Sequence, residues 1–175
     1  MTKAMEVILP VCCGVDIHRD TAVCCLLKVE GKGVKKEIQT FSTMTEDLRT
    51  LRDWLEEAGC THVVVESTGV YWKPLFNILE DSLTVVLANA RHVKNVPGRK
   101  TDVKDCEWLA RLLQCGLIKG SFIPPKWTRE LRDLTRYRRR LVGNISSEKN
   151  RIQKILQDAN IKISTVATNV FGVSG

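Results

Sequence analysis

The chain has 175 residues, a net charge of +7 and seven cysteines. Its length allows one domain with a core of its own and an appendage. No run of about 18 apolar residues occurs, which excludes a transmembrane helix, and the apolar start is too short for a convincing signal peptide. The cysteines show no CxxC or Cys/His spacing, so we interpret them as reduced structural thiols and not as zinc ligands. These features favour a cytoplasmic protein of bacterial type without a membrane partner.

The positive charge is concentrated in one part of the chain. Residues 126–154 contain ten lysines and arginines against three acidic residues, whereas the remainder is balanced. A localised basic stripe is the usual mark of a polyanionic partner. The composition therefore predicts a neutral body with a basic arm.

The N-terminal part predicts three strands joined by short turns. They cover residues 11–17, 21–29 and 34–41. Apolar or alternating runs with such tight connections are typical of an antiparallel meander. Neighbouring residues on a strand point to opposite faces, so we expect one buried thiol from Cys12-Cys13 and one from Cys24-Cys25.

Helix and strand patterns alternate after the meander. The expected elements are a helix from 43 or 45 to 59, a strand at 62–66, a helix at 70–80, a strand at 83–87, a loop at 89–100 and a helix at 102–115. Thr43 or Thr45 is expected to cap the first of these helices. This order is that of an α/β, RNase H-like fold, with a mixed five-stranded sheet and helices on both faces.

A long helix is predicted after the Pro124-Pro125 breaker. With Leu131 at heptad position a, six of the eight a and d positions over four heptads are apolar. This pattern favours a coiled coil, although an amphipathic helix packed on its own domain would show the same pattern. We expect an RNase H-like domain at 1–124, a basic coiled-coil helix at 125–160 and a linker at 161–175.

Four carboxylates stand where a metal-dependent nuclease would need them. Asp16 lies near the end of the first strand and Glu66 directly follows a buried strand, where an acid is costly unless it is used. Asp102 and Asp105 are three residues apart at the expected helix start, hence on one helical face. Together they could hold two Mg²⁺ ions, with Mn²⁺ as a substitute, for phosphodiester cleavage. Helix capping by Asp102 and an ordinary first-turn role for Asp105 remain open.

Basic and aromatic residues near these acids suggest contacts with nucleic acid. The candidate phosphate contacts are Arg91, Lys94, Arg99, Lys100, Lys104, Arg136, Arg138, Arg139 and Arg140. Tyr71 and Trp72 could stack on bases or pack over the sheet. His18 is expected to be a turn residue that could reach Asp16.

Several motifs resemble one protein family. They are GVDIHRDT, VVVESTGVYWKPLFNILE, NARHVKNVPGRKTDVKDCEWLARLL and FIPPKWTRELRDLTRYRRRLV. Together they resemble the RuvC-like DEDD transposases of bacterial insertion sequences, the family numbered one hundred and ten, over about residues 12–175. The D-E-D-D set of that family would fall on Asp16, Glu66, Asp102 and Asp105.

The resemblance implies a DNA transposase or recombinase that binds Mg²⁺, is guided by a structured RNA and works as a homodimer or higher oligomer. It also implies a further C-terminal domain with a nucleophilic serine, so no serine of this chain is assigned that role. A Holliday-junction resolvase-like nuclease and a non-catalytic nucleic-acid-binding module remain alternatives. An actin-like ATPase is disfavoured, because a second glycine-rich phosphate loop is missing and the chain is short for two lobes.

Overall fold

The computed structural model describes residues 7–96, 104–167 and 170–172. The strands are β1 (Val11–Ile17), β2 (Thr21–Glu30), β3 (Gly33–Ser42), β4 (His62–Glu66) and β5 (Thr84–Ala88). The helices are α1 (Thr45–Glu57), α2 (Trp72–Leu79), α3 (Ala90–Asn95), α4 (Asp105–Gln114), α5 (Lys126–Asp158) and the short 3₁₀ helix η1 (Ile163–Thr165). All five expected strands are present, and they differ from the predicted bounds only at their ends.

The strands form one mixed sheet in the order β3-β2-β1-β4-β5. β1, β2 and β3 pair antiparallel, whereas β4 joins β1 and β5 joins β4 in parallel. Gly31 has a φ of +60° in the two-residue turn between β2 and β3, a conformation that glycine adopts at little steric cost. This topology confirms the expected RNase H-like sheet.

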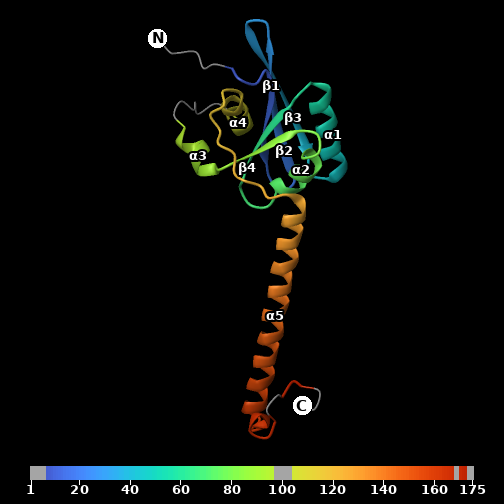
Figure 1. The fold of residues 1–175 in the computed structure, drawn as a ribbon, viewed down its shortest axis with the longest axis vertical. Coiled ribbons are helices and arrows are strands. Elements are labelled where there is room, and N and C mark those ends of the chain that lie inside the picture. Colours follow the sequence, from blue (N-terminus) through green and yellow to red (C-terminus); the bar gives the residue numbers. More distant parts are fainter. Residues whose placement is uncertain (1–6, 97–103, 168–169, 173–175) are drawn as a thin grey trace. The chain divides into compact units, whose positions relative to one another are not determined.

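Helices cover both faces of the sheet (Figure 1). On one face, β1 residues such as Val15 pack with Leu51 of α1 and Leu75 of α2. On the other face, Cys12 packs with α4 residues such as Leu109. Because β1 lies in the middle of the sheet with helices on both sides, its side chains contribute to a core on each face.

This two-sided burial corrects the expectation for the cysteine pairs. Cys12, Cys13, Cys24 and Cys25 are all fully buried, not one of each pair. The prediction assumed one covered face, but both faces of β1 and β2 are covered here. All seven cysteines are free thiols; six are buried and Cys115 is partly buried.

Two further local predictions were wrong. α1 is preceded by Met44 as its N-cap without a side-chain cap, so neither threonine caps it. Instead, Ser42 Oγ accepts a hydrogen bond from the Met44 nitrogen at 3.2 Å and donates one to Asp47.

The second error concerns the expected loop at 89–100, which contains helix α3. The Asn89 side chain accepts a hydrogen bond from the Arg91 nitrogen at 2.9 Å and so caps this helix. Only Val93 of α3 is buried, so the helix lacks the apolar periodicity that would have revealed it.

A single glycine lets α4 lie very close to the sheet. A Cβ atom at Gly14 of β1 would overlap the Cys106 carbonyl oxygen and the Ala110 nitrogen of α4. These are backbone atoms, which cannot move aside without shifting the helix. Gly14 therefore sets the distance between β1 and α4.

The chain divides into two compact units, Met1–Ile123 and Pro124–Gly175. The second unit contains α5, a 33-residue helix with no buried residue. Its apolar seam, including Leu134, Ile145 and Ile155, is exposed in the single chain. None of the described helices is long and apolar enough to cross a bilayer.

Candidate active site at the edge of the sheet

Two acidic side chains stand at the ends of neighbouring parallel strands. Asp16 is the penultimate residue of β1 and Glu66 is the last residue of β4. The strands pair with Val15 opposite Val65, so the two acids follow at the same level of the sheet. Because side chains alternate along a strand, Asp16 shares the face of Cys12, which lies under α4. The topology thus brings both acids to one edge and one face.

Asp105, the third of these acids, is the first residue of α4. The helix begins at Asp105, and its N-cap Lys104 has an extended ψ of 147°. The expected helix start at residue 102 is therefore wrong, because Lys104 is not helical, and a common face for Asp102 and Asp105 stays a prediction. Asp102 itself lies outside the described residues. Asp105 occupies the first turn, where the helix dipole stabilises a negative charge.

The pKa of Asp16 responds to burial and to the charges of its neighbours. Burial raises the pKa of Asp16; His18 lowers it, and the carboxylates of Asp105 and Glu66 raise it. Its side chain is 28% exposed, so solvent screens these charges only in part. Asp16 is thus a partly buried acid held among like charges.

Neighbouring polar side chains orient two of the acids. His18 Nε2 lies 3.4 Å from Asp16 Oδ2, and its backbone nitrogen donates to the Thr21 oxygen at 2.8 Å in the β1–β2 turn. Thr68 Oγ1 donates to Glu66 Oε1 at 2.5 Å. The His18 contact agrees with the expectation that this turn residue could reach Asp16, whereas the Thr68 contact was not predicted.

The chemistry of these donors fits a hard divalent cation. Carboxylate oxygens are the preferred ligands of Mg²⁺ and Mn²⁺. A cation would also relieve the repulsion by Asp105 and Glu66, which adds to burial in raising the pKa of Asp16. Within residues 7–96, 104–167 and 170–172, no group of three or more His, Cys, Asp or Glu side chains is already arranged around a metal position. The fourth expected ligand, Asp102, falls outside these ranges.

The expected basic contacts are distributed over both units. In the first unit, Arg91 and Lys94 lie exposed on α3, and exposed Lys104 directly precedes α4. Arg99 and Lys100 lie outside the described residues. In the second unit, Arg136, Arg138, Arg139 and Arg140 are exposed on α5. α3 starts beside the acids, because Glu66 pairs with Ala88 and the helix cap follows at the next residue.

The two aromatic residues after Glu66 have different environments. Trp72 packs against the core and meets Phe76 edge to face, with ring centroids 5.8 Å apart. Tyr71 is 42% exposed. Packing over the sheet therefore describes Trp72, while base stacking stays open for Tyr71 alone.

An ion-pair network centred on Glu107 was not predicted from the sequence. Glu107 of α4 is 5% exposed. Lys36 Nζ of β3 and Arg111 Nη2 lie 2.8 Å and 2.6 Å from its carboxylate oxygens. The hydrogen bond from Lys36 lowers the pKa of Glu107 against the effect of burial, and Arg111 lowers it as well. The network ties α4 to the edge strand two residues after Asp105.

The chain was compared with known protein families and structures. The model of the DEDD transposase family of IS110 elements, described as Transposase, matches residues 13–161. RuvC from Thermus thermophilus is 16% identical, with a TM-score of 0.41, over 66% of this chain and 84% of that chain. Fowlpox virus resolvase, solved with a Holliday junction DNA substrate, is 14% identical, with a TM-score of 0.36, over 52% of this chain and 65% of that chain. No curated protein matches the chain. Because the family match covers most of its length, the chain belongs to the DEDD transposase family of IS110 insertion sequences.

Proposed function

We propose that this chain supplies the metal-binding half of an active site that cleaves and transfers DNA strands during transposition. The ligands would be Asp16, Glu66, Asp102 and Asp105, with two Mg²⁺ ions and Mn²⁺ as a substitute. The observation that supports the proposal is the placement of Asp16 and Glu66 at the ends of the paired strands β1 and β4, with Asp105 near enough to raise the pKa of Asp16, in a chain of this transposase family.

The chain's own residues would prepare this site in three ways. The parallel pairing of β1 and β4 holds Asp16 and Glu66 side by side. Gly14 lets α4, which begins at Asp105, lie close to β1. Thr68 and His18 restrain the carboxylates of Glu66 and Asp16. Bound divalent ions would activate the attacking oxygen and stabilise the leaving oxygen of a phosphodiester.

Two further parts of the proposal rest on the family resemblance alone. We assign the nucleophilic serine to a further domain and infer a structured guide RNA as a second partner. Exposed Arg91 and Lys94 on α3 would contact phosphates beside the acids, and the arginines of α5 would bind a nucleic acid backbone.

The exposed seam of α5 supports self-association through a coiled coil. Leu134, Leu141, Ile145 and Ile152 are each at least 42% exposed on this helix. Exposure of so many apolar side chains at heptad spacing favours pairing with a second copy. Light scattering should show a concentration-dependent dimer, and a strict monomer at high concentration would contradict this part of the proposal.

Metal-dependent DNA binding tests the proposed site. Fluorescence anisotropy with a labelled branched DNA duplex should show tighter binding when Mg²⁺ or Ca²⁺ is added at constant ionic strength, because ions held by the acids would bridge to phosphates. Asp16→Asn and Glu66→Gln should remove this metal-dependent gain of affinity. Both variants should keep the salt-sensitive binding that the α5 arginines provide.

Asp20→Asn is the matched control, because Asp20 lies in the turn between β1 and β2 and its side chain is 82% exposed. It should behave as the unmodified chain does. If divalent ions leave the affinity unchanged while the basic helix still binds DNA, the chain is a non-catalytic nucleic-acid-binding module. That result would overturn the active-site proposal.

A further inference from the structure

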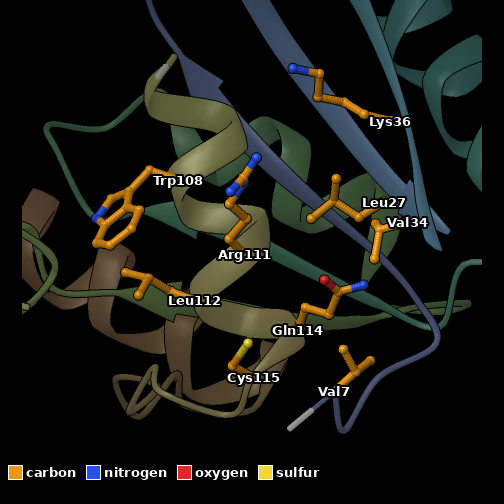
Figure 2. Close-up of a pocket in the computed structure, with 9 residues that line it drawn as sticks. All are labelled: Val7, Leu27, Val34, Lys36, Trp108, Arg111, Leu112, Gln114 and Cys115. Atoms are coloured by element: carbon orange, nitrogen blue, oxygen red, sulfur yellow. The ribbon is translucent and has the colours of Figure 1, made fainter. Parts of the chain in front are cut away.

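A cavity of about 510 Å³ lies along α4, between that helix and strands β2 and β3. Figure 2 shows α4 on one side and Leu27, Val34 and Lys36 on the other. Neither Asp16 nor Glu66 is among the residues that line it. The volume falls in the range of about 300–1,000 Å³ that is usual for small-molecule sites.

The walls of this cavity are mainly apolar. Leu27 of β2 and Leu112 of α4 are buried side chains that face it, and Val34 of β3 stands half-exposed. Val7 closes one end, where the backbone nitrogens of the next two residues donate to the Gln114 oxygen at 2.9 and 3.2 Å. These hydrogen bonds hold the chain after Val7 against the end of α4. The cavity is therefore bounded by secondary structure and by a hydrogen-bonded segment of the first unit.

A buried donor without a partner lines the same space. Gln114 is 4% exposed, and its side-chain Nε2 has no hydrogen-bond partner within the described part of the chain. In Figure 2 this amide extends from α4 toward Val34. A buried N–H group without an acceptor is unfavourable, so an acceptor supplied by a ligand would be bound favourably there.

Both charged side chains that line the cavity are cations. Lys36 and Arg111 share the single carboxylate of Glu107, which leaves one positive charge in excess. Their side chains are 46% and 56% exposed, and an ammonium and a guanidinium have further N–H donors to offer. The cavity therefore combines an apolar interior with positive charge and a free donor.

We propose that this cavity binds a small amphipathic anion, with an apolar ring or chain between Leu27, Val34 and Leu112. Its anionic oxygens would accept hydrogen bonds from Lys36 and Arg111, and a second acceptor would meet Gln114 Nε2. The site is separate from the carboxylates at the edge of the sheet, and it stands whether or not these bind metal.

The probe for this site is 8-anilinonaphthalene-1-sulfonate, which joins aromatic rings to an anionic sulfonate. A fluorescence titration of the whole chain should show saturable binding at one site. The ¹H–¹⁵N spectrum should show a shift of the Gln114 side-chain amide. 1-Anilinonaphthalene, which has the same rings without the sulfonate, should bind at least 10-fold more weakly, and sulfate alone should not displace the probe.

Three variants locate the bound probe. Val34→Trp should fill the cavity from an edge strand that tolerates aromatic residues, and Lys36→Met should remove one cation. Each should weaken binding at least 10-fold. Lys35→Met is the matched control, because Lys35 lines a different hollow beside Leu26. It should leave the affinity unchanged.

Three results would overturn the proposal. The first is the absence of saturable binding to the unmodified chain. The second is equal binding by Lys36→Met and Lys35→Met, a comparison that holds even if Val34→Trp fails to fold. The third is loss of binding in Ile145→Ala, which would place the dye on the exposed seam of α5.

Discussion

At the scale of single residues, Asp16 combines a cost in stability with a proposed role in metal binding. Its carboxylate is partly buried beside Glu66 and Asp105, and burial together with these neighbours raises its pKa. An acid whose pKa is raised on folding weakens the folded state when it ionises. Such a group is expected where charge is needed for function.

Asp16→Asn should therefore stabilise the metal-free chain at neutral pH. Because the folded-state pKa lies above the ordinary value of 3.8, Asp16 costs the wild type stability as pH rises from about 3.8 through the raised pKa. The variant should unfold at a higher urea concentration than the wild type at pH 7 in EDTA. The two proteins should converge below pH 3.8, and a variant less stable than the wild type at pH 7 would contradict this reading.

Glu107 should show the opposite pH dependence. Lys36 and Arg111 lower its pKa, so its ionisation stabilises the folded state above about pH 4.5, and this contribution is lost as pH falls through the lowered pKa. Glu107→Gln should cost about 1–2 kcal/mol at pH 7, because the two cations are half-exposed and partly screened. Urea unfolding should show the difference shrinking below pH 4.5. A difference that does not vary with pH would exclude the ionic origin.

At the scale of elements, the position of α4 decides whether Asp105 reaches the other acids. Beside its apolar packing, two specific contacts position this helix: the close approach over Gly14 and the ion pair between Glu107 and Lys36. One sets the height of the helix above the sheet, and the other ties it to the edge strand. The site thus depends on contacts that lie outside it.

Gly14→Ala should destabilise the first unit by about 1–3 kcal/mol, because the added methyl meets backbone atoms of α4. Gly33→Ala is the control, since a methyl there meets only the Glu30 oxygen, at 3.9 Å. Thermal unfolding should separate the two variants clearly. Equal melting temperatures would mean that α4 shifts without cost and does not depend on Gly14.

The sequence predicted those helices and strands whose own residues show an apolar run or an apolar periodicity. β1 and β4 were visible as apolar runs, and their acids were conspicuous because a charge in such a run needs a reason. α3 was missed, because its stability comes from the Asn89 cap and one buried valine. The pair between Lys36 and Glu107 joins residues 71 positions apart, a contact that no local pattern reveals.

At the scale of the whole molecule, charge and chemistry are divided between two units. The acids gather in the first unit, whereas α5 of the second unit carries the excess positive charge. Basic side chains on an exposed helix favour a nucleic acid backbone as their partner, and the binding should then depend strongly on salt. The division predicts that binding and metal chemistry can be separated by mutation.

Replacing Arg138, Arg139 and Arg140 by alanine should weaken binding to duplex DNA or RNA and flatten its salt dependence. The slope of log affinity against log salt should fall by about 0.9 for each arginine that contacts a DNA phosphate. Arg49→Ala, which removes an exposed side chain of α1 that pairs with Glu46, should leave the slope unchanged. An unaltered slope in the triple variant would remove α5 from the binding surface.

The most direct test of the proposed metal site is thermal unfolding during a Mn²⁺ titration without nucleic acid. A ligand that binds only the folded chain stabilises it by about 2.7 kcal/mol at a concentration 100 times its Kd. The melting temperature of the unmodified chain and of Asp20→Asn should therefore rise with Mn²⁺, whereas that of Asp16→Asn should stay constant. No rise in the unmodified chain, or an equal rise in Asp16→Asn, would contradict a metal site built on Asp16.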